Sequence, residues 1–202
     1  MAFCVAKCEL VCSVTEKNMN RIIQATHFAA RKHSRQTRKN ADASPYINHP
    51  VEVAFHLSAV GNVEDEDILV AALLHDTIED TETSREEIVS LFGEAVASLV
   101  CECTDDKSLP KLERKHLQIE NAPKKSAGAK VIKIADKTCN LRSILSDPPV
   151  DWSIQRQYEY FLWAEKVVNS LLGVNQVLDN EVTHLLQKGL KKLKNTEHPP
   201  GT

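Results

Sequence analysis

Apolar residues recur every three or four positions along most of the chain, and this spacing predicts α-helices. The strongest patterns cover residues 152–172 and 181–193, where leucine, valine and aromatic residues repeat on one face. Only six glycines and eight prolines interrupt the 202 residues, which favours helices over a fold with many turns. We therefore expect an all-α bundle with helices over residues 15–35, 49–61, 64–80, 84–93, 94–103, 111–121, 127–145, 152–172 and 181–193.

The length and composition predict one soluble domain. A chain of 202 residues can form one substantial core and is short for two. The net charge of −3 argues against a general nucleic-acid-binding protein. No apolar run is long enough to cross a bilayer, and the N-terminus mixes charge into its apolar residues too early for a signal peptide. The six cysteines contain no CxxC pair, so we expect reduced thiols in a cytoplasmic protein with no membrane or nucleic-acid partner.

One apolar segment ends abruptly in charged residues. Residues 68–74 are apolar on every side, which is typical of a buried central helix. They lead directly into His75 and Asp76, with Glu79 and Asp80 one turn further on. The members of each pair His75/Glu79 and Asp76/Asp80 are four residues apart, so we expect each pair to share a helix face. Such groups are costly to desolvate unless they are paired or bind a metal, which favours a functional site over a solvated helix end.

Two further residues have the chemistry to complete a metal site. His49 stands at the start of the predicted helix 49–61, and Asp136 interrupts the apolar stripe of the helix 127–145, where a carboxylate needs a strong partner. Together with His75 and Asp76 they offer two imidazoles and two carboxylates. This mixed set suits Mn²⁺, Fe²⁺ or Zn²⁺ better than Ca²⁺, and it leaves coordination positions open for water and substrate.

The order His49, His75-Asp76, Asp136 resembles the H…HD…D signature of HD-domain metal phosphohydrolases. Residues 45–50, 72–81, 104–107 and 133–142 closely resemble the hydrolase domain of the RelA/SpoT family, above all its stand-alone animal members. A bare His-Asp pair carries little weight, whereas four long matches in the right order are specific. The resemblance covers residues 17–190, so we expect an HD hydrolase domain over residues 17–194, an N-terminal extension over 1–16 and a frayed tail over 195–202.

The resemblance implies a single-domain, HD-type helical bundle with one Mn²⁺ ion. It implies hydrolysis of the 3′-diphosphate of guanosine tetra- or pentaphosphate to GDP or GTP and pyrophosphate, so the partner is a small phosphorylated nucleotide. It assigns the metal to His49, His75, Asp76 and Asp136. It assigns the catalytic acidic pair to Glu79 and Asp80, and which of the two accepts the proton of the attacking water stays open.

Charge and motif position together select the candidate substrate contacts. Basic side chains around an acidic metal site suit a polyphosphate, because arginine forks bind phosphate oxygens and the field steers anions inward. Tyr46 suits either stacking on a base or filling the core. The predicted substrate-binding residues are Arg38, Tyr46, Lys111, Asn140, Arg156 and Tyr160.

Three alternatives stay open beside the main prediction. The animal members of the family are also associated with removal of the 2′-phosphate of NADPH, and the same pocket suits either phosphorylated ribose. A different HD enzyme, such as a 5′-nucleotidase, fits less well because of residues 104–107 and the pair Glu79 and Asp80. A non-catalytic nucleotide-binding module predicts the loss of a metal ligand or an acid, whereas all six are present.

Overall fold

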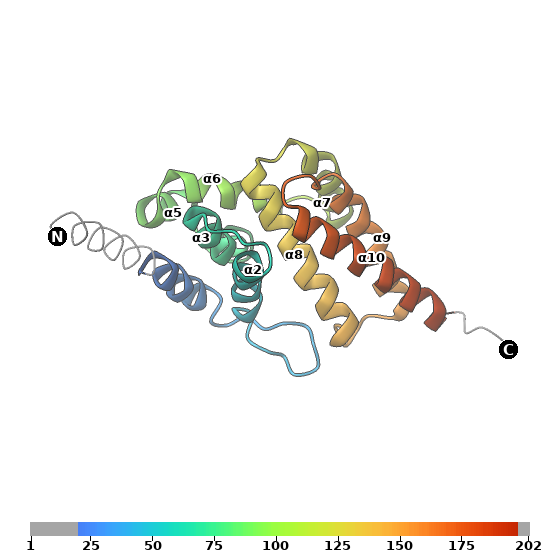
Figure 1. Cartoon of the computed structure of the whole chain (residues 1–202). Coiled ribbons are helices and arrows are strands. Elements are labelled where there is room, and N and C mark those ends of the chain that lie inside the picture. The colour runs from blue at the N-terminus through green and yellow to red at the C-terminus, as the bar shows by residue number, and fades with distance from the viewer. Residues whose placement is uncertain (1–19, 198–202) are drawn as a thin grey trace, which may run out of the picture.

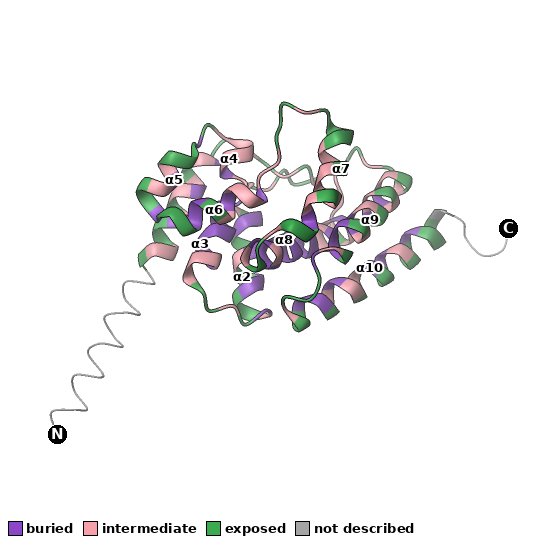
Figure 2. Cartoon of the chain, turned by 90° about the horizontal axis from the view of Figure 1, so that it is seen from above, coloured by how far each residue is buried: buried purple, intermediate pink, exposed green. Residues whose placement is uncertain are grey.

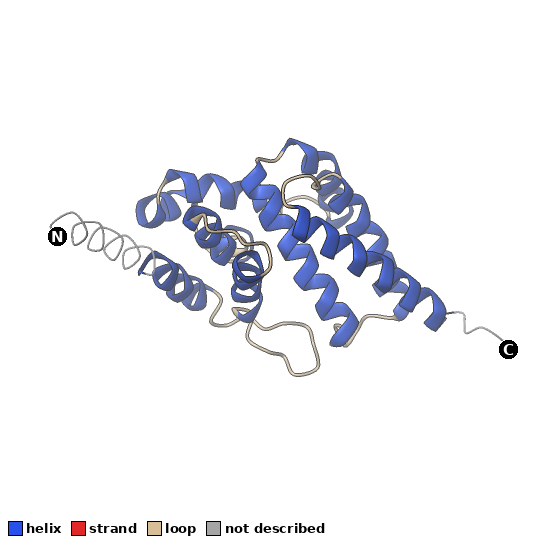
Figure 3. Ribbon diagram, in the orientation of Figure 1, coloured by secondary structure: helices blue, strands red, loops and turns tan. Residues whose placement is uncertain are grey.

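The computed structural model describes residues 20–197, and its regular elements there are helical (Figure 3). An isolated antiparallel bridge joins Thr37 to Pro45 in the loop after the first helix. The expected all-α fold is therefore confirmed. The helices cover residues 20–32, α2 (Asn48–Ala59), α3 (Glu66–Leu74), α4 (Thr77–Asp80), α5 (Arg85–Phe92), α6 (Glu94–Cys103), α7 (Lys111–Asn121), the 3₁₀ turn η1 (Ala122–Lys124), α8 (Ala127–Ser146), α9 (Ile154–Asn169) and α10 (Gln176–Glu197).

Helix α8 lies at the centre of the molecule (Figure 1). It contacts α2, α3 and α6 on one side and α9 and α10 on the other. Every residue from Val131 to Cys139 is buried, including the charged Lys133, Asp136 and Lys137 (Figure 2). Polar groups in such a position require partners inside the protein, so the centre of α8 is where chemistry is expected.

Helices α3 and α4 correct one sequence-based expectation. We expected one helix over residues 64–80, but α3 ends at Leu74 and α4 starts at Thr77. The hydroxyl of Thr77 donates to the carbonyl of Leu74 (2.7 Å), and His75 Nδ1 lies 2.7 Å from the carbonyl of Ala72. Side chains thus occupy carbonyls that a continuing helix would use. The expectation that His75 and Glu79 share one face of a single helix was therefore wrong.

The C-terminal helix is longer than predicted at both ends. It begins at Gln176, five residues before the predicted Glu181, because the side chain of Asn175 accepts from the backbone N–H of Leu178 (3.2 Å) and caps the first turn. It continues to Glu197, so residues 195–197 are helical, with Leu193 buried one turn earlier. The predicted extension over residues 1–16 lies outside the described residues.

Two further sequence-based expectations concern the thiols and the membrane. The cysteines in the described part of the chain, Cys101, Cys103 and Cys139, are free thiols. Among residues 20–197, no helix combines the length and apolar character that crossing a bilayer requires.

Candidate active site

Three side chains from different helices converge at the centre of the molecule. His49 comes from the first turn of α2, His75 from the end of α3 and Asp136 from the middle of α8, and all three are buried. One potential ligand atom of each lies within 4.8 Å of the others. His49 Nε2 is 3.2 Å from Asp136 Oδ1, and His75 Nε2 is 3.9 Å from the same oxygen.

Asp76, the fourth predicted ligand, lies beside these three. Its Oδ2 is 3.1 Å from His75 Nε2 and 3.8 Å from His49 Nε2. The hydroxyl of Tyr46 donates to the same oxygen at 2.6 Å. We call His49, His75, Asp76 and Asp136 the metal cluster, because the structure brings together the four residues that the resemblance assigned to the metal.

The donor set and its hydrogen bonds fit a divalent cation. The Nδ1–H of His75 donates to the carbonyl of Ala72, so in the neutral ring the lone pair of Nε2 faces the carboxylates. That Nε2 is buried and has no hydrogen-bond partner among the described residues. A metal-bound histidine is held in this way, with its second ring nitrogen hydrogen-bonded to the protein.

Two anions in a buried site also change the proton affinity of the cluster. Burial alone would lower the pKa of His75, but Asp76 and Asp136 raise it to about 9. Burial opposes ionisation of Asp76, yet His75 and His49 hold the pKa of this carboxyl well below its usual range. The cluster therefore favours a bound positive charge, and a divalent metal would displace the proton from His75.

Asp136 is the most strongly held carboxylate of the cluster. Lys137 Nζ lies 3.0 Å and Lys133 Nζ 3.9 Å from Asp136 Oδ2, while Asn140 Nδ2 donates to Oδ1 at 2.6 Å. Burial opposes ionisation of Asp136, but Lys137 and the hydrogen bond to His49 keep its pKa well below its usual range. Asp136 is therefore a preformed anion with both of its oxygens fixed in place.

The acidic pair lies on α4, next to the metal cluster. Glu79 accepts the backbone N–H of Asp105 (3.0 Å), and Asp80 forms an ion pair with Lys107. Burial raises the pKa of Glu79, although the N–H of Asp105 opposes the shift. A glutamate with a raised pKa is better matched to proton transfer near neutral pH than a solvated one.

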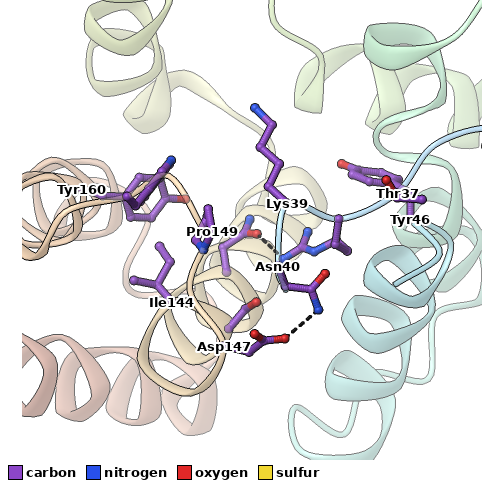
Figure 4. Close-up of a pocket in the computed structure, with 12 residues that line it drawn as sticks. Thr37, Lys39, Asn40, Tyr46, Ile144, Asp147, Pro149 and Tyr160 are labelled. Atoms are coloured by element: carbon purple, nitrogen blue, oxygen red, sulfur yellow. Dashed lines mark hydrogen bonds between the residues drawn. The ribbon is translucent and has the colours of Figure 1, made fainter. Parts of the chain in front are cut away.

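A cavity of about 230 Å³ opens beside the metal cluster. Four of the six predicted substrate-binding residues line it: Arg38, Tyr46, Asn140 and Tyr160. Figure 4 shows Tyr46 and Tyr160 on opposite sides, with the side chain of Asn40 hydrogen-bonded to Asp147 at 2.6 Å. Arg38 Nη2 donates to Asn140 Oδ1 (3.3 Å), and Asn140 in turn donates to Asp136, so the cavity is connected to the metal cluster by hydrogen bonds.

The other two predicted substrate contacts lie in a neighbouring cavity. Lys111 and Arg156 line a second cavity of about 440 Å³. Trp152 and Tyr160 line both cavities and therefore form the wall between them. The guanidinium carbon of Arg156 lies 4.6 Å from the centre of the Trp152 ring, a cation–π contact that orients it.

Sequence reasoning missed several contacts that support this site. Lys133 and Lys137 lie on the apolar face of α8, and the sequence gives no sign that both are paired with Asp136. Lys137 also lies 5.1 Å from the ring centre of Trp163, a contact with α9 that only the tertiary fold creates. Gln36 donates to the backbone carbonyl of Asp80 at 2.6 Å. The sequence does not single out Gln36, because most residues of its loop are polar.

Comparisons with known proteins agree with this geometry. The HD-domain family profile matches residues 25–161. The chain is 51% identical over 170 residues to a human protein named guanosine-3′,5′-bis(diphosphate) 3′-pyrophosphohydrolase MESH1, covering 84% of this chain and 95% of the relative. It is 51% identical over 164 residues to the Xenopus tropicalis protein of the same name, covering 81% of this chain and 92% of the relative.

The similarity to known proteins extends to the three-dimensional fold of a solved structure. It belongs to a metazoan orthologue of SpoT that hydrolyzes ppGpp, with 47% identity, a TM-score of 0.82, and coverage of 84% of this chain and 96% of that one. The profile match spans most of the described chain, and the relatives are matched over nearly their whole length. The chain therefore belongs to the HD-domain family and, within it, to the metazoan SpoT homologues of the RelA/SpoT group.

Proposed function

We infer that this protein is a metal-dependent phosphohydrolase that removes the 3′-diphosphate of guanosine tetra- or pentaphosphate and releases pyrophosphate. The observation that carries this conclusion is the convergence of His49, His75 and Asp136 within 4.8 Å, beside a cavity lined by Arg38 and Tyr46. Relatives at 51% identity carry the name of this activity, and they are matched over more than nine tenths of their length.

Each part of the site has a place in this reaction. We assign the metal to His49, His75, Asp76 and Asp136, where a bound divalent ion would activate water and polarise a phosphoryl oxygen. Glu79 or Asp80 accepts the proton of the attacking water, since both lie on α4 next to the cluster. Arg38 and Asn140 bind phosphate or ribose oxygens, and Tyr46 fixes Asp76 through its hydroxyl.

We propose Mn²⁺ as the metal in the cell. Two histidines and two carboxylates form a set that Mn²⁺, Fe²⁺ and Zn²⁺ all accept, so geometry does not separate them. The family resemblance favours Mn²⁺, one ion per chain. Faster turnover of metal-stripped protein reloaded with Mn²⁺ than with Fe²⁺ or Zn²⁺ would support this choice.

The decisive experiment offers two substrates to the same preparation. Metal-stripped protein is reloaded with Mn²⁺ and given guanosine tetraphosphate and NADPH separately, with pyrophosphate and orthophosphate measured. Metal-dependent pyrophosphate release from guanosine tetraphosphate is the expected result. Orthophosphate from NADPH alone would make the NADPH phosphatase the better description of the same site, and no product from either would refute the proposed function.

The variant Glu79→Gln tests the assignment of the acidic pair. It removes a proton acceptor but keeps the size of the side chain and its ability to accept from Asp105, so we expect turnover to fall by roughly 10²- to 10⁴-fold. Mn²⁺ affinity, measured by titration calorimetry, should not change. If the variant loses Mn²⁺, Glu79 is a metal ligand and its role must be reassigned.

A further inference from the structure

One loop holds both members of the acidic pair. Residues 104–110 connect α6 to α7 and reach α4 through two different groups. The backbone N–H of Asp105 donates to Glu79 Oε2 (3.0 Å), and the ammonium of Lys107 pairs with Asp80 Oδ1. Each carboxylate of the pair is thus held by a donor of its own.

The loop has a defined shape of its own. Asp106 Oδ1 accepts from the backbone N–H (2.9 Å) and from the hydroxyl (2.6 Å) of Ser108, which closes a tight turn. The amide of Gln118, on α7, donates to Asp105 Oδ2. Lys107 therefore lies in a turn whose neighbouring residues, Asp105 before it and Ser108 after it, are both held by hydrogen bonds.

The backbone of Asp80 is fixed independently of its side chain. Gln36 Nε2 donates to the Asp80 carbonyl (2.6 Å), and the Gln36 side-chain oxygen accepts from His33 Nδ1 (2.7 Å). Among the described residues, Lys107 is the one cationic side chain within ion-pair distance of Asp80. The direction of the Asp80 carboxylate thus depends on Lys107.

We propose that Lys107 is a positioning residue that orients the Asp80 carboxylate toward the attacking water. This inference rests on the proposed function of Glu79 and Asp80. Lys107 acts on the reaction through Asp80 and makes no contact with the metal cluster. Its side chain is 48% exposed, and an ion pair this open contributes little to folding stability. The loss of Lys107 should therefore slow turnover without unfolding the protein.

The test compares Lys107→Met and Lys107→Arg with the control Lys124→Met. Lys124 also pairs with a carboxylate, Glu120 at 3.4 Å, and is 63% exposed, but it lies on η1 away from the acidic pair. Steady-state kinetics use the full-length, Mn²⁺-loaded protein with guanosine tetraphosphate. Mn²⁺ titration and thermal unfolding are measured on the same samples.

We expect Lys107→Met to lower kcat by roughly 10- to 100-fold, the effect of a displaced catalytic group, with KM within about twofold of the wild-type value. Lys107→Arg should recover most of kcat, because it restores a cation at the same place. Mn²⁺ affinity and Tm should not change in either variant, and Lys124→Met should match the wild type in all four quantities.

Other outcomes would overturn the inference in distinguishable ways. An unchanged kcat in Lys107→Met would show that Asp80 needs no orientation from this loop. A raised KM with unchanged kcat would make Lys107 a substrate contact, and no recovery in Lys107→Arg would exclude the role of charge. An inactive wild-type protein would instead refute the proposed function, and this inference with it.

Discussion

Two charged clusters share the same pair of helices, and only one of them has the features of a site. Helix α2 contributes His49 to the metal cluster and His56, two turns later, to a second cluster. Helix α8 contributes Asp136 to the first and Arg142 to the second, which Glu181 of α10 completes. We call His56, Arg142 and Glu181 the closed cluster.

The closed cluster balances one guanidinium against one carboxylate. Arg142 pairs with Glu181 through one nitrogen and lies 3.5 Å from His56 Nδ1 through another. His56 Nε2 is 3.2 Å from the second oxygen of Glu181. Burial, with a contribution from Arg142, lowers the pKa of His56, so a neutral histidine lies between one cation and one anion.

Two imidazoles and two carboxylates converge on one point in the metal cluster. Oxygens of Asp76 and Asp136 face the same space as both imidazoles, and the cluster holds two carboxylates where the closed cluster holds one. A cluster of charged side chains alone therefore does not mark a functional centre. Imidazole and carboxylate ligand atoms directed at one point do, because together they form a set that a divalent cation accepts.

Replacing one histidine in each cluster gives the largest contrast. His49→Asn should abolish Mn²⁺ binding and lower turnover by at least roughly 1,000-fold, because the activated water is lost. His56→Asn should keep both and lower the free energy of unfolding by about 1–3 kcal/mol. Calorimetric Mn²⁺ titration, kinetics and denaturant unfolding measure these effects. Full Mn²⁺ binding in His49→Asn would remove the distinction between the clusters.

A smaller effect is expected from the hydrogen bond that orients Asp76. Tyr46→Phe removes the 2.6 Å bond to Asp76 Oδ2 and should weaken Mn²⁺ affinity or turnover by roughly 10- to 100-fold. Tyr158→Phe, on α9, is the matched control and should behave as the wild type. Equal behaviour of the two variants would show that the hydroxyl of Tyr46 does not support the metal cluster.

Metal binding should stabilise the fold through one cluster only. At an Mn²⁺ concentration of about 100 times Kd, the wild type should gain about 2.7 kcal/mol, seen as a rise in Tm. His56→Asn should start from a lower Tm and show the same gain, whereas His49→Asn should show none. A gain in His49→Asn would place the bound metal elsewhere in the protein.

The smallest effect is expected from neutralising the anion of the closed cluster. Glu181→Gln should cost about 1 kcal/mol of unfolding free energy, because its partner Arg142 is 39% exposed and solvent screens the pair. Turnover and Mn²⁺ affinity should not change. A large loss of activity would mean that the closed cluster also serves the reaction.

Much of the site could be predicted because its chemistry depends on residue type and local context. His75 and Asp136 each interrupt an apolar run, and this interruption indicates a buried polar group that needs a partner. The break between α3 and α4 was missed because it depends on Thr77 and His75 bonding to carbonyls of α3. The pairing of Lys137 with Asp136 was missed because lysines on helices are usually solvated.

Lys111 shows a further limit of sequence reasoning. Its basic character and motif position predict a phosphate contact, but the structure places it in the cavity beyond the wall formed by Trp152 and Tyr160. Only the tertiary fold separates the two cavities, since α7 and α9 are more than thirty residues apart in the sequence. The contribution of Lys111 to substrate binding stays a prediction.

The position of Asp136 and Arg142 on one helix limits how this chain can evolve. An α-helix turns by about 100° per residue, so one residue inserted between them would rotate one cluster out of line with α2. Cys139 and Leu141, which are buried between the two clusters, would be turned away from their neighbours as well. Insertions and deletions should therefore be absent from this stretch of α8 in functional descendants, whereas the surface turn at Gly173 could accept them.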